Sequence, residues 1–144
     1  MKNVVFIISL LLLSSCINEN TLHSSFPIQL LHGNSAKVWV LTKSSDPNDR
    51  NVAAMNNYRK SFIFYSNKRF RDQELIHLGS NEGFKGKYTV NNYPNNDIVL
   101  NLNYSDGSVY YFRINTIGNQ TMTLQDINHE EIIWEFTSLK PPKI

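Results

Sequence analysis

The sequence contains very little cysteine, glycine or proline. Its 144 residues include one cysteine, six glycines and five prolines. A single cysteine can form no disulfide within the chain and no CxxC motif for a metal or a redox reaction. Collagen-like and linker-like classes need far more glycine and proline than this. Eight phenylalanines, seven tyrosines and two tryptophans instead predict a folded domain with a hydrophobic core.

The chain also lacks an excess of either charge. Fourteen Lys and Arg stand against twelve Asp and Glu, which leaves a formal net charge of +2. A nucleic-acid-binding protein carries a concentrated basic face, so nucleic acid is not expected as a partner. The densest positive charge comprises Lys68, Arg69 and Arg71, with Arg59 and Lys60 nearby. This cluster is most simply a solvated hairpin end; the alternative is a surface for anionic lipid headgroups or an acidic partner.

No apolar run is long enough to span a membrane. Residues 4–13 form an apolar stretch behind Lys2, whereas a transmembrane helix needs about 20 residues. A positive start, a short apolar core and small residues behind it predict a cleavable secretion signal. The next residues, Leu13-Ser14-Ser15-Cys16, resemble the lipobox processed by the bacterial lipoprotein signal peptidase.

This resemblance implies a lipid anchor on Cys16. In such lipoproteins the cysteine Sγ receives a diacylglyceryl group, the chain is cut before the cysteine, and the new amine is usually acylated. Residues 1–15 would then be the signal peptide and residues 16–25 a lipidated tether. Two or three acyl chains hold a protein on a membrane, whereas one binds only marginally. By analogy with enterobacteria, Ile17 behind the cysteine, in place of Asp, favours the outer membrane.

Behind the tether, short β-type runs alternate with turns. Nineteen asparagines favour turns over long helices. Eight runs predict strands, at residues 37–42, 61–65, 70–75, 84–90, 98–104, 109–115, 121–126 and 131–138. Pro27 near a helix start and Gly33 past its end predict a short helical turn between them. A second short helix is expected over residues 51–55.

Alternation along these runs assigns two faces. In the run 98–104, Leu100 and Leu102 are expected inside, while Asn101 and Asn103 face water. Ile132, Trp134 and Phe136 are likewise expected together, as are Tyr110, Phe112 and Ile114. Between two alternating runs, Asp106-Gly107 predicts a two-residue type I′ hairpin turn, with Gly107 at positive φ.

Eight strands in meander order either curl into a barrel or split into a sandwich. The prediction is an all-β, antiparallel up-and-down barrel over residues 26–144, because closure removes the edge strands of a sheet. The chain resembles the lipocalin-like lipoproteins common in Bacteroidetes, through the tether, the short helix, Trp39 on the first strand and the meander of hairpins. Lipocalins proper carry Gly-x-Trp on that strand, whereas this chain has Lys37-Val38-Trp39. The resemblance implies an Arg stacked on the Trp, for which Arg113 is the candidate.

Aromatic side chains dominate the expected inner face. They are Trp39, Phe62, Phe64, Phe84, Tyr88, Tyr104, Phe112, Trp134 and Phe136. They are expected to fill the core or to line an apolar ligand cavity. The four histidines show no metal-ligand spacing, and no nucleophile elbow, P-loop or dinucleotide motif is present. A non-catalytic protein without metal or cofactor, apart from the lipid on Cys16, is therefore expected.

Two functions remain open from the sequence. The first is a lipid-anchored binding module that holds a small apolar ligand at the cell envelope. The second is a protein-interaction module, such as an accessory subunit of an envelope machine, an immunity lipoprotein or an inhibitor of a cell-wall hydrolase.

Overall fold

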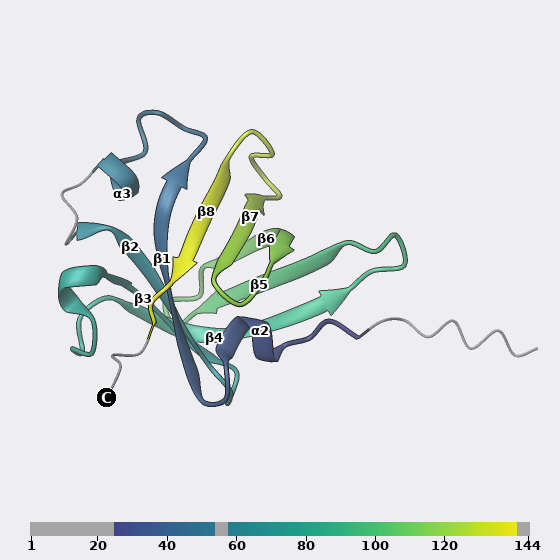
Figure 1. Cartoon of the computed structure of the whole chain (residues 1–144), viewed down its shortest axis with the longest axis horizontal. Coiled ribbons are helices and arrows are strands. Elements are labelled where there is room, and N and C mark those ends of the chain that lie inside the picture. The colour runs from purple at the N-terminus through teal and green to yellow at the C-terminus, as the bar shows by residue number, and fades with distance from the viewer. Residues whose placement is uncertain (1–24, 54–57, 141–144) are drawn as a thin grey trace, which may run out of the picture.

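The described chain is mostly β-sheet. The computed structural model describes residues 25–53 and 58–140 (Figure 1). Two short α-helices are present there, α2 (Gln29–His32) and α3 (Arg50–Ala53), with one 3-10 helix, η3 (Leu75–His77). The strands are β1 (Ala36–Ser44), β2 (Lys60–Tyr65), β3 (Arg69–Glu74), β4 (Phe84–Asn92), β5 (Ile98–Tyr104), β6 (Val109–Ile117), β7 (Thr121–Asp126) and β8 (Ile133–Ser138). No strand boundary differs by more than two residues from the prediction. The predicted signal peptide and Cys16 lie outside the described residues.

The eight strands close into an up-and-down barrel. Each strand pairs antiparallel with the next, and β8 pairs with β1 (Figure 1). The predicted fold class is therefore confirmed. Because successive strands run in opposite directions, their connections alternate between the two barrel ends. We call the end that carries the β1–β2, β3–β4, β5–β6 and β7–β8 connections the mouth, and the opposite end, where α2 precedes β1, the floor.

The floor is closed by α2 and the first strand. Leu31 of α2 is fully buried in the core, and its carbonyl accepts a hydrogen bond of 2.8 Å from the indole Nε1 of Trp39. The ammonium of Lys37 lies 4.2 Å from the centre of the Trp39 ring and donates to the Leu30 carbonyl. Burial lowers the pKa of Lys37. A cation over an aromatic face is stabilising. Lys37, two residues before Trp39 on β1, therefore helps to hold the Trp39 ring in place.

The predicted role of Arg113 is wrong. Its guanidinium lies 3.4 Å from the Asp97 carboxylate and bonds to Gln125 Oε1 at 3.1 Å. Gln125 is its cross-strand partner on β7. The cation over Trp39 is instead Lys37.

Three hairpins share one loop design. In each, the amide of the third loop residue donates to the carbonyl of a tyrosine: Lys68 to Tyr65, Asn96 to Tyr93, and Gly107 to Tyr104. These third residues have φ of 66°, 64° and 91°. The pattern is a type I turn followed by a left-handed residue. The positive φ predicted for Gly107 is confirmed, but the two-residue type I′ turn is wrong, because Asp106 is not among the positive-φ residues.

The face assignments hold in the middle of the strands and fail near their ends. Leu100, Leu102 and Phe136 are buried as predicted. Phe84 and Tyr110, both expected inside, are 62% and 48% exposed, since each lies at the mouth. Ile132 precedes β8 rather than belonging to it.

Asn101 also departs from its prediction. It is half-buried, and its Oδ1 is enclosed without a hydrogen-bond partner. The outward face of β5 is therefore drier than the asparagines suggest.

Candidate ligand-binding site at the barrel mouth

The barrel mouth contains a pocket. Its volume is about 320 Å³, at the lower end of the range for small-molecule sites. We call it the mouth pocket. It is lined by Lys60, Phe62, Asp72, Phe84, Tyr104, Asp106, Ser108, Tyr110, Phe112 and Trp134. Six of these ten side chains are aromatic, so the walls suit an apolar ligand.

An ion pair lies among these rings. Lys60 Nζ is 2.7 Å from Asp72 Oδ2, and the two side chains are 18% and 8% exposed. The Tyr104 hydroxyl donates to the same Asp72 oxygen at 2.7 Å. Alternation along β2 and β3 puts Lys60 on the face of Phe62 and Asp72 on the face of Phe70. One carboxylate oxygen thus holds both a cation and a phenol inside the barrel.

The environment of Tyr104 keeps its hydroxyl protonated. Burial raises the pKa of Tyr104, and the Asp72 carboxylate raises it further through charge and the hydrogen bond. The ring packs edge-on against Phe70, at 4.9 Å between centroids, and against Tyr110 at 5.3 Å. Tyr104 is therefore a fixed hydrogen-bond donor to Asp72.

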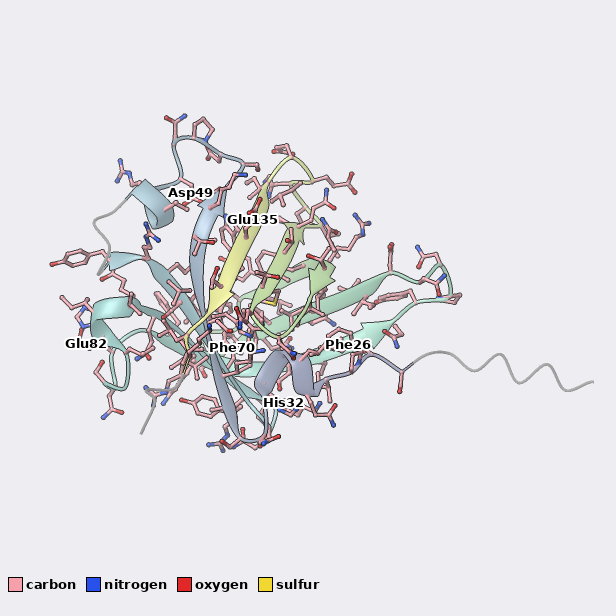
Figure 2. All side chains as sticks on the ribbon, viewed as in Figure 1. Phe26, His32, Asp49, Phe70, Glu82 and Glu135 are labelled. Carbon is pink, nitrogen blue, oxygen red and sulfur yellow. The ribbon has the colours of Figure 1, made fainter. Side chains whose placement is uncertain are left out.

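Trp134 forms one wall of the mouth pocket. Its Nε1 donates to Asp49 Oδ2 at 2.8 Å. Because Asp49 lies on the β1–β2 connection (Figure 2), this bond ties β8 to that connection. Its ring lies 5.5 Å from Phe112 and 6.2 Å from Phe136, measured between centroids. The Lys60 ammonium is 5.8 Å from the Trp134 ring centre and 5.1 Å from that of Phe62. The lysine thus lies between two aromatic walls.

Toward the floor, the barrel interior is packed. Trp39, Phe64, Phe70, Tyr88 and Phe136 are each no more than 1% exposed. Tyr88 meets Phe64 edge-on at 5.1 Å, and its hydroxyl donates to the Tyr65 carbonyl. Burial raises the pKa of Tyr88 to about 12. These rings fill the space that a deeper cavity would need.

The aromatic residues named from the sequence therefore divide into two groups. Trp39, Phe64, Tyr88 and Phe136 belong to the packed floor, whereas Phe62, Phe84, Tyr104, Phe112 and Trp134 line the mouth pocket. Of these residues, Phe84 alone is exposed, because it forms part of the rim of the pocket.

Sequence reasoning missed Lys60 and Asp72 as site residues. The signal was present, because each polar residue lies two positions from an inward phenylalanine in an otherwise apolar alternation. A charged residue on the apolar face of a strand is expected to have a buried partner.

The pocket can accept an apolar body and one polar end. Its aromatic walls exclude water from the body, and the lysine provides hydrogen-bond donors. The Ser108 hydroxyl donates its single proton to Asp106 Oδ1 at 2.6 Å, which lowers the pKa of Asp106, so towards a ligand its oxygen can only accept. Across residues 25–53 and 58–140, no three His, Cys, Asp or Glu side chains are grouped to hold a metal ion. No helix in the same ranges has the length and apolar character to cross a membrane.

No protein-family model matches this chain. No curated protein and no solved structure is significantly similar to it.

Proposed function

We propose that this chain is a lipid-anchored lipoprotein of the bacterial cell envelope whose barrel binds a small ligand in the mouth pocket. The observation that carries the binding role is the Lys60–Asp72 pair, enclosed by aromatic rings at the open end of an otherwise packed barrel. Burying two charges is expensive, and well-packed apolar residues are often as stable there. The pair is therefore better explained by a ligand than by stability.

The expected ligand is small and mainly apolar, with one hydrogen-bond-accepting end. The volume of about 320 Å³ corresponds to roughly ten water molecules at about 30 Å³ each. The Lys60 ammonium has three N–H donors, one of which meets Asp72. A carbonyl, hydroxyl or carboxylate of the ligand would accept another. No catalytic role is proposed, and the module acts by holding its ligand.

The anchor proposal rests on the sequence around Cys16. The lipobox-like Leu13-Ser14-Ser15-Cys16 supports diacylglyceryl and N-acyl chains on Cys16, and Ile17 supports the outer membrane. Cys16→Ala should abolish incorporation of radiolabelled palmitate and release the chain from the membrane fraction. Palmitate that still appears on the variant would contradict the anchor.

Native mass spectrometry of the full chain, released from detergent, tests ligand binding. The wild-type chain should carry a co-purified molecule of small mass. Ser108→Trp should remove that molecule, because the new ring fills the mouth pocket. Ser66→Trp, in the exposed β2–β3 hairpin at the floor end, is the matched control and should retain it. A wild-type chain without any added mass, or equal retention in both variants, would contradict the proposal.

The exposed rim favours a second candidate, a protein-interaction module. Phe84 and Tyr110 are 62% and 48% exposed beside the pocket, and aromatic residues are frequent anchors in interfaces. A photo-crosslinking residue at position 110 should capture an envelope protein in cells if the rim is an interface. The same residue at position 111, on the outer face of β6, is the control. Crosslinking at neither position leaves the small ligand as the better account.

A further inference from the structure

A second hollow lies on the outer face of the barrel and is strongly cationic. Its volume is about 770 Å³, and its lining includes Asn67, Arg69, Arg71, Lys85, Lys87 and Asn103. These residues alternate with inward ones such as Phe70 and Tyr88, so they point away from the core. We call this region the cationic hollow. The inward residues Phe70 and Tyr104 also contribute to its lining. Tyr104 lines the mouth pocket as well, whereas Lys60 and Asp72 line the mouth pocket alone.

The four cations face one another across two strands. Arg69 on β3 is directly opposite Lys87 on β4, and Arg71 is directly opposite Lys85. Residues opposite each other in antiparallel strands have Cβ atoms about 5 Å apart, and like charges there are destabilising. The fold thus tolerates two repulsive pairs side by side.

No carboxylate of the described residues neutralises these cations. Arg69, Arg71, Lys85 and Lys87 occur in none of the ion pairs found there. Arg71 donates to the Ser80 carbonyl at 2.7 Å, which orients it without cancelling its charge. The nearby acidic residues Glu74 and Glu82 both face His77. The hollow therefore keeps about four positive charges free for an external anion.

The hollow reaches the end of the barrel where the tether joins the domain. Arg69 follows the β2–β3 hairpin at the floor end, and the Ser66 amide of that hairpin donates to the Ser35 carbonyl just behind α2. The first described residue, Ser25, lies nine positions behind Cys16. At about 3.3–3.6 Å per residue, such a segment spans about 30 Å at most. A lipid on Cys16 would thus keep the floor end close to the membrane.

We propose that the cationic hollow binds the phosphate groups of anionic phospholipids in the membrane that holds the chain. This inference rests on the proposed anchor. Lys and Arg side chains close to an anionic bilayer are attracted by its negative surface potential, and phosphate oxygens accept hydrogen bonds from guanidinium, ammonium and amide groups.

Lysine accessibility on the full, lipidated chain tests this contact. The chain is reconstituted into vesicles of phosphatidylcholine alone, or of phosphatidylcholine with phosphatidylglycerol, and treated with a water-soluble amine acylating reagent. Mass spectrometry then gives the labelling of each lysine. Phosphatidylglycerol should slow labelling of Lys85 and Lys87 several-fold, and high salt should restore it. Lys43, exposed on β1 toward the mouth and paired with Glu135, is the internal control and should not change.

Two variants link the protection to the arginines. Arg69→Gln with Arg71→Gln should remove most of the protection of Lys85 and Lys87. Arg50→Gln, at the exposed start of α3, is the control and should keep it. Equal labelling of Lys85 and Lys87 in both kinds of vesicle would overturn the proposal.

Two further experiments distinguish a lipid phosphate from other anions and test the lipid anchor independently of the hollow. Protection by inorganic pyrophosphate in phosphatidylcholine vesicles, without protection by phosphatidylglycerol, would assign the hollow to a free phosphate and overturn the lipid source. Protection only on adding an acidic protein would overturn it in the same way. Failure of the chain to float with phosphatidylcholine vesicles would contradict the anchor, whereas flotation without lysine protection contradicts the hollow alone.

Discussion

Inward and outward side chains alternate in the same way at both ends of the barrel, yet the floor end is packed and the mouth end contains a pocket. At the floor, inward positions carry Trp39, Phe64 and Tyr88, which are fully buried. At the mouth, they carry Lys60, Asp72 and Tyr104; Lys60 and Tyr104 both donate to Asp72 beside a pocket. The strand pattern decides which side chains point inward. Their chemistry and their height along the barrel decide whether the interior is filled or open.

The largest expected effect contrasts the two tryptophans. Trp39→Ala should cost about 3–5 kcal/mol of unfolding free energy, the range for large-to-small changes in a core. It also leaves the Leu31 carbonyl without its indole donor. Trp134→Ala should cost less, about 1–2 kcal/mol, because Trp134 is only half-buried and part of its surface already meets water. Urea denaturation of both variants measures this, and equal losses would break the contrast between floor and mouth.

The ion pair in the mouth gives the next largest effect. Asp72→Ala should cost about 3 kcal/mol, since it leaves Lys60 mostly buried without its partner. The triple variant Lys60→Met, Asp72→Leu and Tyr104→Phe should recover most of that stability, because apolar side chains replace the two buried charges and the hydroxyl that bonds to Asp72. A triple variant as unstable as Asp72→Ala would mean that the pair serves stability, which removes the argument for a ligand.

The hairpin loops allow a smaller comparison. Gly107→Val should cost about 1–2 kcal/mol, because a branched side chain strains a left-handed residue. Beyond the two neighbouring residues of the chain, no atom lies within 4 Å of a Cβ built at Gly107, so the effect isolates the backbone. Lys68→Gly, at the same position of the β2–β3 loop, should instead stabilise the domain by about 0.5 kcal/mol, because glycine adopts a left-handed conformation without the steric cost of a Cβ. Thermal unfolding would contradict the shared loop design if both substitutions shifted Tm in the same direction.

Asn101→Ala should have the smallest effect. Its Oδ1 is enclosed without a partner, so truncation removes an unsatisfied group while losing little packing. The free energy of unfolding should change by less than about 0.5 kcal/mol. A loss larger than that of Gly107→Val would show that the amide makes contacts absent from this structure.

Strand positions and closure could be predicted because alternation and turn residues are local signals. Height along the barrel could not, since period-two alternation assigns a face and says nothing of how close a residue lies to the rim. Alternation therefore predicts Phe84 and Tyr110 in the core, although they form the mouth.

The length of the β5–β6 loop and the grouping of the cations could not be predicted from the sequence, for different reasons. Asp106-Gly107 is compatible with both a two-residue turn and the three-residue loop that forms, in which Asp106 Oδ1 accepts the Ser108 amide. The basic cluster predicted near the β2–β3 hairpin divides in the fold. Lys60 points inward to Asp72, while Arg69 and Arg71 join two lysines of β4 that are distant in sequence.

Acrylamide quenching of single tryptophans tests most directly that the floor is packed and the mouth is open. Trp134→Phe leaves Trp39 as the sole indole of the full chain, and Trp39→Phe leaves Trp134. Trp39 is fully buried and Trp134 is half-buried beside the pocket. The structure therefore predicts little quenching of Trp39 and clear quenching of Trp134. Equal quenching of the two, or stronger quenching of Trp39, would contradict the account.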